Sequence, residues 1–286
     1  MDISLSHIYS RFIEHREGGG YCMQVNRLYR EMLSYLGFRF IGVLGRVGSE
    51  SEGFSGLSHT CTLVYLPSHL DEDKGKKVYY HTDVGFGRHP HRPMLLRHNH
   101  EEFERGTDKS RLVKTALQPS TTLEETDDEA DTEVATVAEM QGVWKVQSQS
   151  EGKEWEDRYC FNTFQCHQPD LDAANRATSH PTSIPFATTV IVVQHRLDPS
   201  LSSPELVKKD GLHADLYPYH PSAVEQHILV ADKLIVRTAN SNSVKSLESE
   251  EERVKVIKEH FGLLKHVTVE EALKEIEGKP SAFKKA

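Results

Sequence analysis

The sequence predicts an α+β fold with a short N-terminal helical segment, a central antiparallel β-barrel and a C-terminal α/β region. Three observations predict it. Apolar residues recur at helical spacing after residue 22, short β-branched and aromatic runs occupy the middle of the chain, and helical spacing returns after residue 250. With 286 residues and 37% hydrophobic content, the chain is long enough to bury a substantial core.

The N-terminal helix is predicted to begin at Cys22, directly after the glycine run at residues 18–20. Gly37 supplies its stop, and one face carries apolar residues at steps of three and four: Val25, Leu28, Tyr29, Met32, Leu33 and Leu36. Unpaired N–H groups and the helix dipole favour a thiolate at such a position, and the glycines let the backbone turn sharply. Cys22 is therefore a candidate nucleophile, although a cysteine that merely packs fits the pattern equally well.

Residues 59–66 and 78–84 are predicted to form the two strands of a hairpin, with a polar connection between them. In an antiparallel pair the start of the first strand lies beside the end of the second, which places His59 near Asp83. A thiol, an imidazole and a carboxylate in this arrangement can serve as nucleophile, base and orienting group. The set is a far more specific signal than Cys22 alone.

Further strands are predicted at residues 142–147, 155–164, 188–195, 227–231 and 233–239. Residues 250–261 have the spacing of an amphipathic helix, and Thr268 is predicted to cap a second helix over residues 269–276. We divide the chain into an N-terminal helical region, a β-barrel domain and a C-terminal α/β region, at residues 1–47, 48–195 and 196–286.

The segments around these residues resemble the arylamine N-acetyltransferase family. The family's cysteine motif matches Gly19-Gly20-Tyr21-Cys22, its catalytic histidine at the start of a strand matches His59, and its Asp-Val-Gly-Phe-Gly motif matches residues 83–87 without a change. Supporting similarities span nearly the whole chain, at Asn26, residues 45–47, residues 179–183 and residues 259–263. The chain is similar to a fungal-like, N-terminally shortened member.

The resemblance implies a cysteine-protease-like core with the C-terminal α/β region as a lid, and acetyl transfer from acetyl-CoA to arylamines or hydrazines in xenobiotic metabolism. It implies that Cys22 accepts the acyl group, that His59 is its base and that Asp83 orients the imidazole. It also implies contacts with CoA at Ser55, Gly56, Thr182 and Ser183. Acetyl-CoA, or another acyl-CoA, is expected as a cosubstrate, with no permanently bound cofactor and no metal.

The chain departs from the family pattern near the nucleophile. Gly18 stands where an arginine is usual, with Arg16 nearby as a substitute, Gln24 stands in place of a glutamate, and Ala177 in place of an aromatic residue. Family members also carry a helical domain before the cysteine motif, whereas here a single short segment precedes it. Without that domain, part of the apolar face of the Cys22 helix is expected to lie in water. Because each large apolar side chain left in water forgoes about 1.5–3 kcal/mol of burial, we expect a chain that is unstable, aggregation-prone or dimeric through that face.

The formal net charge of −9 is unfavourable for binding nucleic acid. Eight acidic and no basic side chains fall within residues 118–141, which accounts for nearly all of that charge. This tract lacks apolar periodicity and is predicted to be a disordered, exposed insertion in the barrel. No apolar run of signal-peptide or membrane length occurs near the N-terminus, so we expect a cytoplasmic protein with small-molecule partners and no membrane contact, as a monomer or a dimer.

Two other patterns are weaker. The four cysteines form no CxxC pattern and indicate neither a disulfide framework nor a zinc site. The pairs His89/His91 and His98/His100 lie among prolines and charged residues, which favours an exposed loop over a metal site.

Three functions fit the residues. The first is an acyl-CoA-dependent N-acyltransferase that works through an acyl-cysteine in two half-reactions. The second is a cysteine hydrolase with the same three residue types in the same order, disfavoured only by the flanking motifs. The third is an inactive, truncated relative that serves as a binding module.

Overall fold

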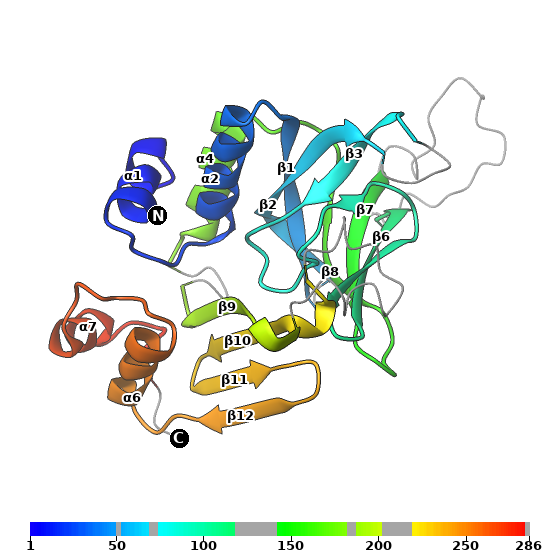
Figure 1. Cartoon of the computed structure of the whole chain (residues 1–286). Helices are drawn as coiled ribbons and strands as arrows, with labels where there is room; N and C mark the ends of the chain where they lie inside the picture. The colour runs from blue at the N-terminus through cyan, green and yellow to red at the C-terminus, as the bar shows by residue number, and fades with distance from the viewer. Residues whose placement is uncertain (50–52, 69–73, 118–141, 182–186, 202–218, 284–286) are drawn as a thin grey trace.

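The computed structural model describes residues 1–49, 53–68, 74–117, 142–181, 187–201 and 219–283 (Figure 1). The acidic tract at residues 118–141 lies outside the described residues, so its predicted disorder stays a prediction. Thr182 and Ser183 also lie outside them.

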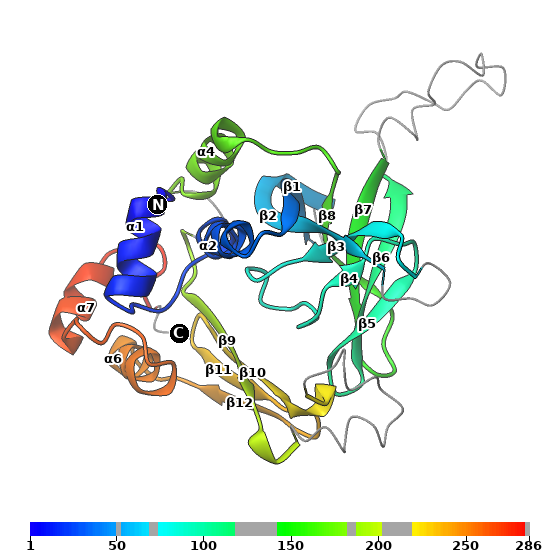
Figure 2. The same ribbon diagram turned by 45° about the horizontal axis from the view of Figure 1, so that its top comes forward.

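The main body is an eight-stranded antiparallel sheet that curls into an almost closed barrel (Figure 2). Its strand order is β4-β3-β2-β1-β8-β7-β6-β5. The strands are β1 (Arg39–Ser49), β2 (Gly53–Pro67), β3 (Lys77–Thr82), β4 (Met94–Leu95), β5 (His100–Arg105), β6 (Asp108–Ala116), β7 (Gly142–Gln149) and β8 (Glu156–Phe161). This arrangement confirms the predicted antiparallel barrel and the β2–β3 hairpin.

The barrel interior is an apolar core built from alternating residues of neighbouring strands. It comprises Val43, Cys61, Leu63, Met94, Leu112, Val146, Tyr159 and Phe161, each at most 1% exposed. Six consecutive residues of β2, from His59 to Val64, are buried because both of its faces are covered. One face looks into the barrel and the other supports helices.

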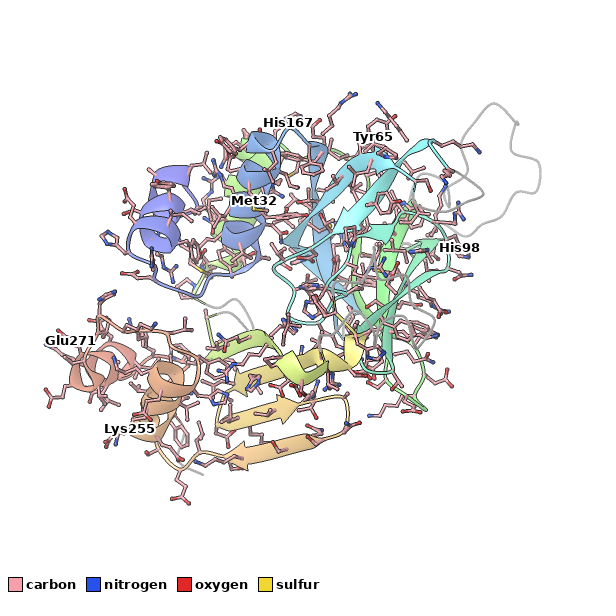
Figure 3. All side chains as sticks on the ribbon, in the orientation of Figure 1. Met32, Tyr65, His98, His167, Lys255 and Glu271 are labelled. Atoms are coloured by element: carbon pink, nitrogen blue, oxygen red, sulfur yellow. The ribbon has the colours of Figure 1, made fainter. Side chains whose placement is uncertain are left out.

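Two helices pack on the outer face of β2: α2 (Cys22–Tyr35) and α4 (Gln168–Thr178). Helix α2 begins at Cys22 and is followed by Gly37 with a φ of 82°, as the sequence predicted. Its buried face differs from the predicted apolar stripe. Asn26 and Arg30 are buried, whereas Met32 is 49% exposed (Figure 3). Hydrogen bonds to β2 determine which face of α2 packs against the sheet, because Asn26 and Arg30 both donate to Thr60.

The N-terminal segment runs beside these helices as α1 (Leu5–Tyr9), which continues as a π-helical turn (Ser10–Glu14). The first residues are tied to α2 and α4. The amide of Gln24 donates to the Asp2 carbonyl (2.9 Å), and Asn175 donates to the Met1 carbonyl (2.8 Å). A glutamate at position 24 could not donate this bond, which gives the Gln24 departure a structural reason.

A second antiparallel sheet has the order β12-β11-β10-β9. Its strands are β9 (Ile191–Leu197), β10 (Val224–Val230), β11 (Lys233–Arg237) and β12 (Asn242–Ser246). The predicted strand at 188–195 therefore belongs to this sheet, where it pairs with β10, and not to the barrel. Sequence periodicity does not identify strand partners.

The C-terminal helices α6 (Glu250–Lys255) and α7 (Val269–Ile276) flank the second sheet (Figure 1). A π-helical turn (Val256–His260) extends α6 toward the predicted end of that helix. Thr268 caps α7, and its hydroxyl accepts from the Glu271 N–H while the Glu271 side chain returns to the cap, which confirms the predicted cap. No helix among the described residues is long and apolar enough to cross a membrane. The predicted domain limits stay predictions.

Candidate active site

The structure brings Cys22, His59 and Asp83 together where α2 meets the barrel. Cys22 is the first residue of α2, His59 lies in β2 opposite Gly45 of β1, and Asp83 follows β3 directly. The His59 Nε2 is 2.6 Å from Asp83 Oδ2. The Cys22 thiol donates to the Ser58 carbonyl oxygen, 3.7 Å from the sulfur, and Cys22 lies close enough to the same imidazole to raise its pKa.

All three side chains are buried. His59 is 2% exposed, Cys22 3% and the Asp83 residue 6%. Burial removes water that would compete for the imidazole and the thiol, and it strengthens each charge interaction between them. The arrangement is a sequestered thiol–imidazole–carboxylate relay, so it can take up and return a proton at sulfur.

Asp83 is held by four hydrogen-bond donors. Its Oδ1 accepts from Asn26 Nδ2 (3.0 Å) and from the Gly85 N–H (2.8 Å). Its Oδ2 accepts from His59 and from the Tyr159 hydroxyl (2.7 Å). A carboxylate offers about four lone-pair sites, so this group is fully satisfied as an anion and fixed in orientation.

These contacts shift the pKa values of the pair in opposite directions. Burial lowers the pKa of His59, but the charges of Asp83 and Cys22 outweigh burial and raise that pKa to about 10. Burial raises the pKa of Asp83, but the attraction and hydrogen bond of His59 outweigh it and lower the pKa of the carboxyl. The pair therefore rests as imidazolium and carboxylate at neutral pH.

A tyrosine and a second histidine extend this network, and sequence reasoning missed both. Burial, followed by the Asp83 charge, raises the pKa of the Tyr159 hydroxyl well above its ordinary value, so the hydroxyl stays a donor to Asp83. Its oxygen is 2.7 Å from His81 Nε2. Because the single hydroxyl proton points at Asp83, His81 donates to Tyr159. Burial lowers the pKa of His81 to about 4, so this ring is neutral.

The loop after Asp83 packs directly on the nucleophile. A Cβ on Gly85 would lie 2.6 Å from the Cys22 Cα and 2.8 Å from Asn26 Nδ2, so only glycine lets the loop approach this closely. Phe86 covers the other side, with its ring centroid 5.2 Å from His59 in an edge-to-face arrangement. The motif at residues 83–87 thus supplies the carboxylate, the close approach and an apolar cover.

The glycine run before Cys22 is also closely packed. A Cβ at Gly20 would lie 2.5 Å from the Phe12 ring, and one at Gly18 would lie 2.6 Å from the Leu263 side chain. Any larger residue at position 18 would have to displace Leu263. Arg16, the nearby basic residue, takes a φ of 53° and lines a cleft with Arg11 and Lys265.

Of the four residues expected to contact CoA, Ser55 and Gly56 are described. The Ser55 hydroxyl is 2.8 Å from the Ser58 hydroxyl, accepts from the Val47 N–H (2.9 Å) and donates to the Gly56 carbonyl (2.8 Å). It therefore shapes the end of the β1–β2 hairpin whose Ser58 carbonyl faces Cys22. A Cβ on Gly56 would meet nothing within 4 Å, so this position is open.

A sequence profile of the family described as N-acetyltransferase matches residues 1–202. A search of curated protein sequences finds no match.

Solved structures of similar fold include the arylamine N-acetyltransferase of Nocardia farcinica, with a TM-score of 0.67 and 22% identity over 98% of this chain and 78% of that one. The enzyme of Salmonella typhimurium has a TM-score of 0.66 and 18% identity, over 96% of this chain and 81% of that one. The Mycobacterium marinum enzyme in complex with CoA has a TM-score of 0.67 and 21% identity, over 96% of this chain and 82% of that one. At these identities the structures show the fold alone, and the sequence profile shows the family.

Proposed function

Because the chain belongs to the arylamine N-acetyltransferase family, we propose that it transfers an acetyl group from acetyl-CoA to an arylamine or hydrazine through an acyl-cysteine at Cys22. The observation that carries the proposal is the buried group in which the His59 imidazole is hydrogen-bonded to the fully bonded Asp83 and interacts electrostatically with Cys22. Charge separation of this kind makes a thiol nucleophilic without any metal or permanently bound cofactor.

In the first half-reaction, the Cys22 sulfur attacks the thioester carbonyl carbon of acetyl-CoA. The carbon–sulfur bond to CoA then breaks, and the His59 imidazolium gives its proton to the departing CoA sulfur. Tyr21 gives α2 no side-chain cap, and the Gln24 N–H donates to the Tyr21 carbonyl, so we assign the N–H groups of Cys22 and Met23 to the oxyanion that forms on the carbonyl oxygen. Acetyl-Cys22 and free CoA are the products.

In the second half-reaction, the amine nitrogen attacks the acetyl carbonyl carbon of acetyl-Cys22. Neutral His59 takes the proton from nitrogen, and the carbon–sulfur bond to Cys22 breaks as the N-acetyl product forms. Asp83 stabilises the imidazolium in each cycle and keeps one ring nitrogen turned toward the sulfur. The same cleft serves both substrates in turn.

Acetyl-CoA is the cosubstrate in this proposal. The Mycobacterium marinum enzyme was solved in complex with CoA, which supports the same ligand here. We assign CoA contacts to Ser55 and Gly56, at the hairpin end beside Cys22, and to Thr182 and Ser183. A role in xenobiotic metabolism, a cytoplasmic location and a monomeric or dimeric state complete the proposal.

The competing activity is hydrolysis by the same relay, in which water replaces the amine. A product assay separates the two. The chain is incubated with acetyl-CoA, with and without aniline, and acetanilide, acetate and free CoA are quantified by liquid chromatography and mass spectrometry. We expect acetanilide in amounts equal to the CoA released, and no product from the Cys22→Ala variant. Acetate release at the same rate with and without aniline would identify a hydrolase.

A further inference from the structure

Three residues of α2 form a polar stripe along the seam between this helix and β2. Cys22, Asn26 and Arg30 are spaced by four residues, which places them on one face of the helix, and all three are buried. The Cys22 thiol donates to the Ser58 carbonyl oxygen (3.7 Å), and Asn26 Nδ2 donates to the Thr60 carbonyl oxygen (2.8 Å). The stripe therefore holds the helix of the nucleophile against the strand residues on either side of the imidazole.

Arg30 makes the last contacts of this stripe. Its Nη1 donates to the Thr60 hydroxyl oxygen (3.2 Å) and to the Cys61 carbonyl oxygen (3.4 Å). The guanidinium also lies against β1, since a Cβ on Gly42 would be 3.0 Å from Nη1 and 3.2 Å from Cζ. A side chain at position 42 would therefore crowd the guanidinium.

Arg30 is buried without an acidic partner. It is 7% exposed, and among the described residues it bonds only neutral oxygens and its Nη2 has no hydrogen-bond partner. The other arginine buried in the described part of the chain, Arg253, is bound by both carboxylate oxygens of Glu250 (2.8 and 2.6 Å). The pairing of Arg253 is the usual arrangement for a buried charge, so Arg30 needs another explanation.

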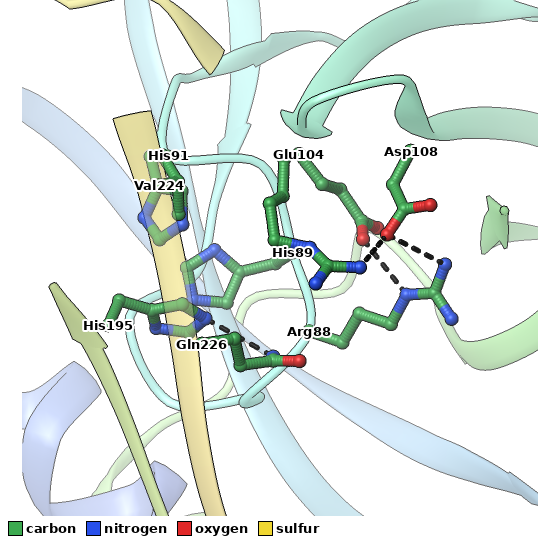
Figure 4. Close-up of a pocket in the computed structure, with 9 residues that line it drawn as sticks. Arg88, His89, His91, Glu104, Asp108, His195, Val224 and Gln226 are labelled. Carbon is green, nitrogen blue, oxygen red and sulfur yellow. Dashed lines mark hydrogen bonds and ion pairs between the residues drawn. The ribbon is translucent and has the colours of Figure 1, made fainter. Parts of the chain in front are cut away.

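An arginine at the junction of the barrel and the second sheet is also paired (Figure 4). Arg88 Nε lies 2.9 Å from Glu104 Oε2. The loop that carries Arg88 was predicted to be exposed, but its residues His89 and His91 are half-buried and contact His195 of β9. Burial is accompanied by an ion pair there, whereas the arginine of α2 has none.

The unpaired charge lowers the free energy of unfolding. Burial lowers the pKa of Arg30, yet a guanidinium keeps its proton, so the charge stays in the seam. The buried Thr62 hydroxyl, opposite Gly42 in the ladder and two residues beyond Thr60, also has no partner among the described residues. Both unsatisfied groups lie along this seam, which indicates that stability is given up here for another purpose.

We propose that Arg30 is a positioning residue for acetyl transfer, which fixes the register of α2 on β2 and so the separation of the Cys22 sulfur from the His59 imidazole. The role rests on the acetyl transfer proposed above. Arg30 touches neither reacting group, and its two bonds hold the two residues that follow His59 in β2. A displacement of about 1 Å between reacting groups can cost roughly a hundredfold in rate.

Two contacts are needed because one would leave the helix free to pivot. Asn26 fixes the first point, since its Nδ2 reaches both the Thr60 carbonyl oxygen and Asp83 Oδ1 (3.0 Å). Arg30 lies about one turn further from Cys22 and fixes the second point. Together they define how the helix lies on the strand.

The first test is Arg30→Met, which removes the charge and both bonds but keeps an unbranched apolar chain. We expect an equal or higher melting temperature, because an unpaired buried charge is gone. The saturating rate of Cys22 acetylation in single-turnover kinetics should nevertheless fall roughly tenfold to a hundredfold. The half-saturating acetyl-CoA concentration should stay within about twofold, since a side chain buried in the helix seam does not touch acetyl-CoA.

A second readout does not depend on acetyl transfer. The rate of Cys22 alkylation by iodoacetamide, followed by intact mass from about pH 5 to pH 9, reports the thiolate that the His59 imidazolium stabilises. In Arg30→Met we expect the midpoint of this profile to move to higher pH, because the imidazolium lies farther from the sulfur. If the unmodified chain acquires no acetyl group, the proposed function fails, and the alkylation profiles still decide the role of Arg30.

Two companion variants and a control complete the test. Lysine in Arg30→Lys can restore one of the two bonds, so acetylation should recover in part. Gly42→Ala keeps the arginine but crowds its guanidinium, so acetylation should slow. Arg27→Met is the matched control, because Arg27 lies on the same helix but donates to the Ile3 carbonyl oxygen (2.6 Å) of the N-terminal segment. Its acetylation and alkylation rates should equal those of the unmodified chain.

Unchanged acetylation and alkylation in a folded Arg30→Met chain would overturn the proposal. An acetylation rate that falls together with the melting temperature would also overturn it, since that is the result of a purely structural arginine. If Arg30→Met does not fold, the same criteria apply to Gly42→Ala and Arg30→Lys.

Discussion

The Tyr159 hydroxyl and the His59 imidazole donate to the same oxygen of Asp83, at 2.7 and 2.6 Å. Tyr159 comes from β8 and His59 from β2, and the two strands are joined through β1. Asp83 is therefore oriented by the barrel as a whole and not only by its own hairpin.

Replacing Tyr159 with phenylalanine should lower kcat/KM about tenfold and destabilise the fold by about 1–3 kcal/mol, because Asp83 and His81 both lose a buried partner. Steady-state kinetics and urea unfolding measure the two effects. Tyr65→Phe is the matched control, since Tyr65 is partly exposed and contacts the Tyr79 ring (Figure 3). Equal kinetics in Tyr159→Phe and Tyr65→Phe would remove Tyr159 from the positioning network.

Replacing Asp83 with asparagine should leave the chain folded and reduce the acetylation rate by roughly 10²-fold or more. An amide cannot stabilise the His59 imidazolium as a carboxylate does, and its nitrogen cannot accept from two of the four donors that Asp83 satisfies. Single-turnover kinetics with acetyl-CoA measure the loss, and circular dichroism checks the fold. Near-normal acetylation in a folded variant would mean that Asp83 only shapes the loop.

The pH dependence of stability follows from the shifted pKa of His59. Its pKa of about 10 in the folded chain exceeds the unfolded value of about 6.5. The protonated imidazole therefore contributes its full stability below pH 6.5, and this contribution is lost as the pH rises toward 10.

The measurement is the free energy of unfolding in urea for the unmodified chain and for Asp83→Asn, at several pH values from 6.5 to 10. We expect the difference between the two chains to shrink as the pH rises. A difference that stays constant across this window would show that the ion pair of His59 and Asp83 contributes nothing to the fold.

Gly85→Ala should reduce activity by roughly tenfold to a hundredfold, because the added Cβ would lie 2.6 Å from the Cys22 Cα and the loop would have to retreat. That retreat would lengthen the bond between the Gly85 N–H and Asp83. Val84→Ala is the control, since it shortens an exposed side chain in the same loop. Equal kcat/KM in the two variants would show that the loop tolerates the displacement.

The sequence predicted the parts of the site that depend on short stretches of chain. Cys22 at the start of a helix after glycines, and the hairpin that brings His59 near Asp83, follow from local spacing and turn chemistry. Thr268 as the cap of the last helix is of the same kind.

The remaining features depend on contacts between distant segments. Tyr159 enters the site because β8 pairs with β1, a choice that strand periodicity does not encode. The inward alternation of Tyr159 and Phe161 was the one available signal. Helix α4 was missed, and the buried face of α2 was predicted wrongly because hydrogen bonds from Asn26 and Arg30 to β2 outweigh the apolar stripe.

The most direct test of the account is the intact mass of the protein after incubation with acetyl-CoA in the absence of amine. Burial raises the pKa values of the other three thiols, Cys61, Cys160 and Cys166. A raised pKa disfavours the thiolate, which is the nucleophilic form, so none of the three is expected to attack acetyl-CoA. We predict a single added acetyl group, located at Cys22 by peptide mapping, absent from Cys22→Ala and removed when aniline is added. Acetylation at another cysteine, or an acetylated Cys22→Ala chain, would contradict the account.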